Sequence, residues 1–306
     1  MSFSTEVKKE LSQIETSGEQ ARAELSALIR MLGSINLSNK GLSLVMQTQN
    51  SVVARRIFSL IKQIYGLKSQ LIVQTRSQFG RHHVYQVQVG DASTELLNDL
   101  EILDGLAFKI GVADAIKKST NNIRAYLRGV FLASGSVRNP EKSQYHLELF
   151  SVYDEQAVDL LEMLEVIGIK GKQFEKKNGT IVYLKNSADI SEFLLFTGAT
   201  KAMLQVENAK IIKEIKRDVN RKLNFETANM NRTVDASSRQ IEMILEMKAN
   251  GTFNQLSEKI QEIAELRLKF PEKSVAEIAQ VLGLTKSAAN HRFRKLIQIY
   301  DERHTK

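Results

Sequence analysis

The side chains best suited to chemistry in this sequence lie near its C-terminal end. Four polar residues recur at helical spacing, which places them on one side of a helix: Ser287, Asn290, His291 and Arg294. Their donors and acceptors suit base edges in the major groove of DNA. Three basic residues beside them suit phosphate oxygens: Lys286, Arg292 and Lys295. The segment predicts a DNA-binding helix, although any one of these residues alone also fits a solvated helix face.

The residues around this segment have the features of a helix-turn-helix motif. Ser274 and Glu277 have the spacing of a capping box, which begins a helix. Gly283 follows as the residue of a sharp turn, and Thr285 is placed to cap the next helix. The buried side of that helix is an apolar stripe of Ala289, Phe293 and Leu296. Together these signals predict a helix-turn-helix at about residues 273–306, and we include Ser274 and Thr285 among its DNA-binding candidates.

The charge of the chain favours an anionic partner. Its 306 residues include 43 Lys and Arg against 35 Asp and Glu, a net charge of +8. The excess lies at the C-terminal end, where residues 201–306 carry 20 basic and 14 acidic residues. This balance indicates nucleic acid as a partner, although an ordinary basic protein can have the same composition.

The composition also excludes several classes of site. There is no cysteine, which excludes disulfides, cysteine-based zinc sites and cysteine nucleophiles. His291 has no His or Cys nearby to share a metal ion, and no glycine-rich phosphate loop is present, so we predict no metal and no cofactor. No apolar run reaches the roughly 20 residues that span a bilayer, and the N-terminus lacks a signal-peptide core. These features predict a cytoplasmic protein with no membrane contact.

An internal repeat occupies the first two thirds of the chain. The segment ending at Gly33 matches the segment ending at Gly135 at an offset of 102 residues, and each has the period of a helix. Each helix precedes the same order of strand, helix, strand, strand and helix, with a further strand pairing with the first. Gly66 and Gly168 are expected to cap the middle helix of each copy. The repeat predicts an α+β fold whose two pseudo-symmetric halves share a helical seam.

The repeated helix resembles that of a known family. Its second copy, Phe131-Leu-Ala-Ser-Gly-Ser-Val137, resembles the LAGLIDADG helix of homing endonucleases, and nearly the whole chain resembles the WhiA family. The resemblance implies two αββαββα LAGLIDADG-like repeats followed by an all-α helix-turn-helix domain. It also implies that the two repeated helices pack against each other through small residues.

The same resemblance draws attention to two positions that lack an acid. In the nucleases, an acidic residue just before the terminal glycine of each helix binds the divalent cations that cut DNA. Leu32 and Ser134 occupy these positions here. Neither side chain supplies the carboxylate oxygens that such a cation needs. We therefore expect a nuclease fold without nuclease activity, and a protein that is not an enzyme.

The chain is expected to divide into four parts. A basic helix is predicted from residue 201, and the Asn-rich residues 220–231 are predicted to turn between two helices, because Asn tolerates left-handed conformations. The parts are an N-terminal helix (1–19), a degenerate LAGLIDADG-like domain (20–200, with repeats at 20–104 and 122–200), a basic helical linker (201–254) and a helix-turn-helix DNA-binding domain (255–306).

The resemblance to the WhiA family also implies a function. It implies a nucleoid-associated transcriptional regulator that binds double-stranded DNA and acts in cell division, chromosome segregation and, in spore formers, sporulation. Neither composition nor spacing indicates these roles. Two alternatives stay open. One is an active homing endonuclease, which Leu32 and Ser134 oppose, and the other is a protein-interaction adaptor for RNA polymerase or division proteins.

Overall fold

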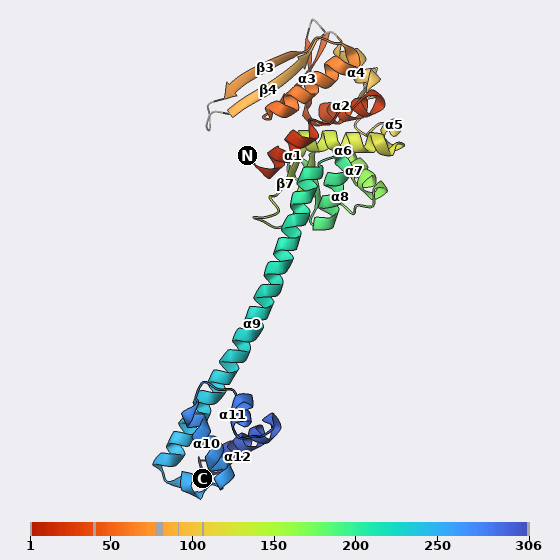
Figure 1. The fold of residues 1–306 in the computed structure, drawn as a ribbon. Helices are drawn as coiled ribbons and strands as arrows, with labels where there is room; N and C mark the ends of the chain where they lie inside the picture. The colour runs from red at the N-terminus through yellow and green to blue at the C-terminus, as the bar shows by residue number, and fades with distance from the viewer. Residues whose placement is uncertain (1, 39–40, 77–81, 91, 106, 305–306) are drawn as a thin grey trace. The chain divides into compact units, whose positions relative to one another are not determined.

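The structure, a computed structural model, describes residues 2–38, 41–76, 82–90, 92–105 and 107–304. The chain forms two compact units, residues 1–213 and residues 214–306 (Figure 1). The first unit holds both copies of the repeat, and the second holds the helix-turn-helix segment. The boundaries of the four parts expected from the sequence stay predictions.

The first copy of the repeat places helices on one face of a four-stranded antiparallel sheet. Its elements are α2 (Gly18–Leu32), β1 (Gly33–Ser38), β2 (Gly41–Thr48), α3 (Ser51–Tyr65), β3 (Gln70–Arg76), β4 (His82–Val89) and α4 (Ser93–Asp99). The strand order is β1-β2-β4-β3. Leu44 and Met46 of β2 pair with Val89 and Val87 of β4, and all four side chains are buried. This face of the sheet is therefore the one that the helices cover.

The second copy repeats this order. Its elements are α6 (Thr120–Ser134), β7 (Gly135–Val137), β8 (Leu147–Ser151), α7 (Asp154–Val166), β9 (Lys172–Lys176), β10 (Gly179–Leu184) and α8 (Ser187–Thr197). The strand order β7-β8-β10-β9 matches that of the first sheet. The unit also contains α1 (Phe3–Leu11), before the first copy, and β5 (Leu103–Asp104), β6 (Ala107–Phe108) and α5 (Asp114–Lys117), between the copies. The predicted αββαββα repeat is confirmed.

The glycines at the ends of α2 and α6 lead directly into strands. Gly33 and Gly135 have φ of −77° and −73°, so neither adopts the left-handed conformation of a helix cap. Both are nevertheless crowded: a Cβ on Gly33 would stand 2.5 Å from the backbone oxygen of Ile29. Gly66 and Gly168, in contrast, have φ of +65° and +78° and are left-handed, as predicted.

The two copies meet along α2 and α6, which form the largest helix contact of the unit. Gly129 lies where the helices cross. A Cβ at this position would stand 2.5 Å from the backbone oxygen of Glu24 and 2.8 Å from the Cβ of Ala27. Only glycine therefore allows the two backbones to approach this closely.

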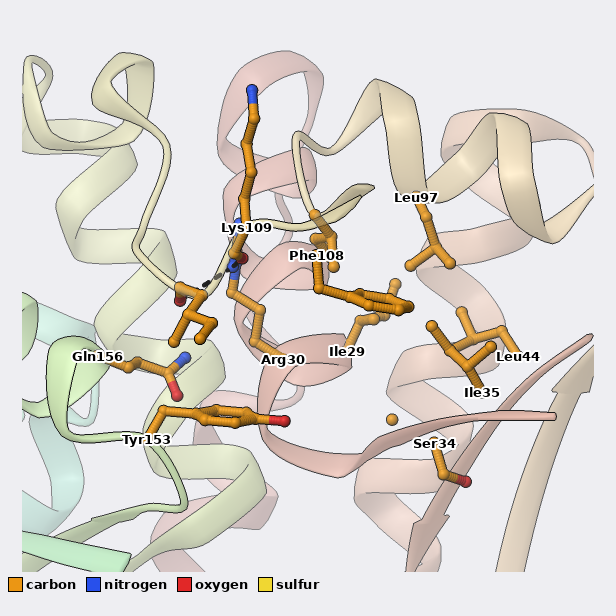
Figure 2. Close-up of a pocket in the computed structure, with 13 residues that line it drawn as sticks. Ile29, Arg30, Ser34, Ile35, Leu44, Leu97, Phe108, Lys109, Tyr153 and Gln156 are labelled. Atoms are coloured by element: carbon orange, nitrogen blue, oxygen red, sulfur yellow. Dashed lines mark hydrogen bonds between the residues drawn. The ribbon is translucent and has the colours of Figure 1, made fainter. Parts of the chain in front are cut away.

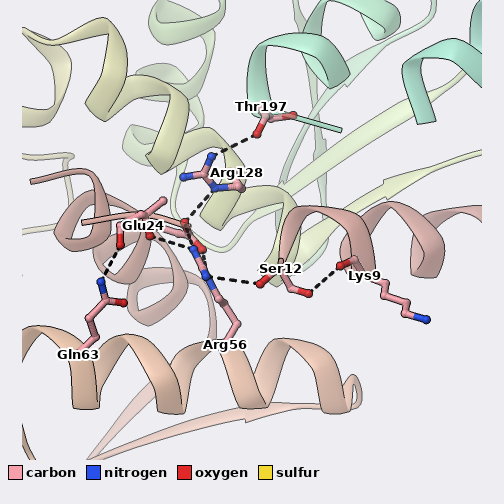
Figure 3. Close-up of polar contacts among 8 residues, drawn as sticks. Lys9, Ser12, Glu24, Arg56, Gln63, Arg128 and Thr197 are labelled. Carbon is pink, nitrogen blue, oxygen red and sulfur yellow. Dashed lines mark hydrogen bonds and ion pairs between the residues drawn. The ribbon is translucent and has the colours of Figure 1, made fainter. Parts of the chain in front are cut away.

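A buried ion-pair network crosses the same seam (Figure 3). The fully buried carboxylate of Glu24 accepts hydrogen bonds from Arg56 Nε at 2.7 Å and from Arg128 Nε at 2.9 Å. Arg56 also donates to Thr16 Oγ1, and Arg128 donates to the backbone oxygen of Thr197. The network joins α2, α3, α6 and the end of α8. Removal of Glu24 would leave the buried Arg128 and the partly buried Arg56 without their shared carboxylate.

One long helix, α9 (Thr200–Ala249), contradicts the turn predicted for residues 220–231. The sequence has no glycine or proline between Gly198 and Gly251, so no residue in this span strongly breaks a helix. Each Asn costs only roughly 0.5 kcal/mol of helix propensity relative to Ala. The predicted turn in this Asn-rich stretch is therefore wrong.

The second unit packs four further helices on the C-terminal part of α9. They are η1 (Thr252–Gln255), α10 (Glu258–Lys269), α11 (Val275–Val281) and α12 (Lys286–His304). Their shared core includes Ile244 and Met247 of α9, Ile263 of α10, Ile278 of α11 and Phe293 of α12. Within the described residues, no helix is both long and apolar enough to cross a membrane.

Candidate nucleic-acid interface

Helix α12 has one buried side and one exposed side. Ala289, Phe293 and Leu296 are buried in the core of the second unit, as the apolar spacing predicts. The other side carries the residues proposed to contact DNA. Lys286, Ser287, His291, Arg294 and Lys295 are exposed, and Asn290 is half-buried. The structure thus brings these six residues together on one helix surface.

Local hydrogen bonds form the starts of α11 and α12, on either side of a glycine turn. The Ser274 hydroxyl accepts from the Glu277 backbone N–H at 3.3 Å, and the Glu277 carboxylate accepts from the Ser274 N–H at 2.8 Å. Gly283 has φ of +66°, and Thr285 Oγ1 accepts from the backbone N–H of Ala288 at 3.2 Å. The capping box, the glycine turn and the Thr285 cap are therefore confirmed as local structure. The hydrogen bonds from the Ser274 hydroxyl and backbone hold the pKa of Glu277 below its ordinary value.

Arg292 differs from the other basic residues of α12. Its Nη1 donates to Glu262 Oε2 at 3.1 Å and to the backbone oxygen of Lys259 at 3.3 Å, both on α10. Its side chain is only 19% exposed. The observed contacts join α12 to α10, and contact of Arg292 with phosphate stays a prediction.

A buried arginine that the sequence analysis missed contacts the buried side of α12. Arg267 of α10 is 1% exposed. Its Nε donates to Gln240 Oε1 of α9 at 2.9 Å, its Nη1 donates to the backbone oxygen of Lys273 at 2.5 Å, and its guanidinium lies 5.3 Å from the ring centroid of Phe293. Burial lowers the pKa of the Arg267 guanidinium, which stays charged near neutral pH. Arg267 therefore connects α9, the turn before α11 and the buried side of α12.

The sequence did contain a signal for this residue. Arg267 follows Ile263 by four residues, so it lies on the buried side of an amphipathic helix. A second α9 contact supports the same turn, where the Ser237 hydroxyl donates to the backbone oxygen of Pro271 at 2.6 Å. Sequence spacing identifies neither Gln240 nor Ser237 as a partner of the motif.

The positions that hold acids in homing endonucleases are the last residues of α2 and α6, Leu32 and Ser134. Leu32 is half-buried against the core of the first unit. The Ser134 hydroxyl donates to the backbone oxygen of Val130 at 3.3 Å and lies 3.8 Å from Met31 Sδ. Among the residues that the structure describes, no group of three or more His, Cys, Asp or Glu side chains is placed to hold a metal ion.

A cavity of about 390 Å³ lies beside the end of α2 (Figure 2). Its walls are mainly apolar side chains, among them Ile29, Ile35, Leu44, Leu97 and Phe108. Arg30 also lines it, but the guanidinium donates to backbone oxygens of residues 101, 109 and 110 at 2.5–3.2 Å. These bonds hold the segment that connects the two copies. Arg30 therefore has a structural role in the first unit.

Comparison with known proteins identifies the family. Models of the WhiA N-terminal LAGLIDADG-like domain, the WhiA LAGLIDADG-like domain and the WhiA C-terminal HTH domain match residues 18–103, 123–216 and 219–300. A relative from Enterococcus faecalis is 43% identical, covering 97% of this chain and 96% of its own length. The chain belongs to the WhiA family. The family and the fold class expected from the sequence are thereby confirmed.

The relatives and solved structures agree with this membership. The Enterococcus faecalis protein and a relative from Lysinibacillus sphaericus are each named probable cell division protein WhiA. The second is 41% identical over 98% of this chain and 97% of its own length. The crystal structure of full-length WhiA from Thermatoga maritima is 25% identical, covers 99% of both chains and has a TM-score of 0.62. A WhiA N-terminal LAGLIDADG domain, 22% identical with a TM-score of 0.52, covers 64% of this chain and 90% of its own, and shows the shared fold alone.

Proposed function

We propose that this protein binds double-stranded DNA through the exposed side of α12 and acts as a sequence-specific transcriptional regulator. The observation that carries the proposal is the arrangement of α12. Its apolar stripe is buried, while Ser287, Asn290, His291 and Arg294 occupy the other side of a capped helix-turn-helix. In that motif the N-terminal part of the second helix enters the major groove.

The proposed contacts differ in what they contribute. Arg294 and Asn290 carry donors and acceptors that can discriminate base edges, with Ser287 and His291 beside them. Lys286 and Lys295 would contact phosphates, which supply salt-dependent affinity with little discrimination among sequences. Ser274 and Thr285 stand at the starts of α11 and α12, where backbone N–H groups also suit phosphate.

We also propose that the LAGLIDADG-like unit has lost nuclease activity. Leu32 and Ser134 stand where cleavage would need carboxylates, and Ser134 already bonds its own helix. The relatives are named cell division proteins rather than enzymes. Regulation of division and chromosome segregation genes, and of sporulation in a spore former, is the role we propose. A protein with this role would lie at the nucleoid in the cytoplasm.

The test is DNase footprinting of the full chain on genomic fragments, across a salt series and with Mg²⁺ present. Specific footprints that are lost in the double variant Asn290→Ala/Arg294→Ala, with no cleavage products, would support the proposal. Unchanged footprints in that variant would move the DNA contact away from α12. Cleavage products would overturn the loss of nuclease activity. Salt-insensitive binding to a protein, with no footprint, would favour an adaptor instead.

A further inference from the structure

Residues 214–232, in the middle of α9, are exposed to solvent on all sides of the helix. Every side chain from Glu214 to Arg232 is exposed, within the second unit. Helices in proteins gain most of their stability by packing an apolar side, and an isolated helix is marginal in water. An apolar side along this segment would therefore indicate a missing partner.

Such a side is present. Five apolar residues lie within an arc of about 100° when each residue advances the helix by 100°: Ile215, Val219, Leu223, Met230 and Val234. Their side chains are between 52% and 62% exposed. Further along the same side of α9, Ser237 and Ile244 are buried against the helices of the second unit. We call residues 215–234 on this side the α9 stripe.

The spacing of the α9 stripe is the same in both directions along the helix. Glu226 lies on the same side, between Leu223 and Met230. With Glu226 included, the intervals between successive positions along the chain are four, four, three, four and four residues. A second copy lying antiparallel, with the twofold axis between residues 224 and 225, therefore meets the stripe position for position. Ile215 would face Val234, Val219 would face Met230, and Leu223 would face Glu226. We propose that a second copy of this chain packs antiparallel along the α9 stripe.

The charges favour the same orientation. Antiparallel pairing about this axis brings Lys222 beside Glu226 of the second copy, on the same flank of the stripe, and does so twice. Parallel pairing in register would instead set Lys222 level with Lys222, and Glu226 level with Glu226, of the second copy. Like charges at one level oppose association, and opposite charges select partner and orientation.

The size of the stripe sets the expected strength. Twenty residues of helix extend about 30 Å, so a two-helix contact lies near the lower limit of roughly 1,000 Å² for a specific interface. The dimer should therefore depend on protein concentration in the micromolar range. Two symmetric Lys222–Glu226 contacts at its edge should make it weaken as salt increases.

Single cysteines test the register directly, because the native chain contains none. Mixing Val219→Cys with Met230→Cys full-length protein under mild oxidation should give a disulfide-linked heterodimer, while either variant alone gives little product. Ala228→Cys, exposed on the opposite side of α9, is the control and should crosslink with neither. Efficient self-crosslinking of Val219→Cys alone would overturn the antiparallel register, because its two copies would lie 11 residues apart along the axis.

Sedimentation equilibrium of the unmodified chain gives an independent result. We expect reversible dimerisation that Lys222→Glu weakens by at least about tenfold, and that adding Glu226→Lys to the same chain restores. A wild-type protein that stays monomeric up to about 100 µM would overturn the proposal. That result would also be expected if a different protein, and not a second copy, covers the stripe. Neither measurement uses DNA, so failure here and failure of the proposed function are separable.

Discussion

Replacing Arg267 with methionine removes three buried contacts while keeping an unbranched, flexible side chain. Gln240 Oε1 and the backbone oxygen of Lys273 lose donors at 2.9 and 2.5 Å, and the Phe293 ring loses the guanidinium beside it. Hydrogen bonds to a charged group contribute about 1.5–3 kcal/mol each, and a desolvated cation–π contact contributes about 2 kcal/mol. Relief of the desolvation cost of the guanidinium offsets part of this loss. We expect the free energy of unfolding of the second unit to fall by about 3 kcal/mol, a large share of the roughly 5–10 kcal/mol of such a unit.

Amide hydrogen exchange of the full chain measures this change locally. Peptides from α11 and α12 should lose about two orders of magnitude of protection, while peptides from α2 and α6 in the first unit stay unchanged. The double variant Arg267→Met/Gln240→Met should recover part of the loss, since neither partner of that bond is left unsatisfied. A change of less than about threefold in the single variant would refute the reasoning that Arg267 holds the helix-turn-helix together.

Three further outcomes follow from the contacts described above. Gly129→Ala should lower the free energy of unfolding of the first unit by about 1–3 kcal/mol, because the new Cβ would stand 2.5 Å from a backbone oxygen of α2. The control is Gly90→Ala, whose Cβ would meet no atom within 4 Å and which should leave the stability unchanged. Equal stability of the two variants would contradict the close approach at the seam. Ser274→Ala should destabilise α11 by about 1 kcal/mol. The pKa of Glu277 is lower in the folded than in the unfolded protein, so its carboxylate stabilises the cap at pH values above the unfolded pKa. This stabilisation is lost as the pH falls through the folded pKa. Thermal unfolding from about pH 6 to pH 3 should therefore show a pH-dependent loss of stability that Glu277→Gln lacks. Lys295→Ala should weaken binding to all DNA sequences alike and reduce the slope of log K against log salt by about 1, and an unchanged slope would remove it from the phosphate contacts.

The sequence was sufficient to predict most of the first unit, because its elements have strong local periods. The order of helices and strands predicted for each copy is the observed order, and β1 and β7 are the further strands that pair with the next strand of their own sheet. The crossing of α2 and α6 could not be located in the same way. Gly129 and Gly135 both lie in the repeated segment, but only Gly129 faces the partner helix, and that depends on how two distant helices rotate toward each other.

In the helix-turn-helix, too, contacts between neighbours in the sequence could be predicted, whereas contacts between distant residues could not. Ser274, Gly283 and Thr285 adopt the predicted turn because their hydrogen bonds and backbone angles involve near neighbours. The bond from Arg267 to Gln240 joins residues 27 apart on different helices, and no local pattern encodes it. The predicted turn in α9 failed for a related reason: Asn permits a turn but does not require one when the surrounding sequence continues a helix.

The measurement that most directly tests DNA recognition by α12 compares specific and non-specific binding in three proteins. Dissociation constants for a footprinted site and for a scrambled site would be measured at one fixed salt concentration for wild type, Arg294→Ala and Lys295→Ala. We predict that Arg294→Ala reduces the difference in binding free energy between the two sites by about 1–3 kcal/mol. Lys295→Ala should weaken binding to both sites and leave the ratio of the two constants nearly unchanged. An unaltered ratio in Arg294→Ala would contradict sequence recognition through the exposed side of α12.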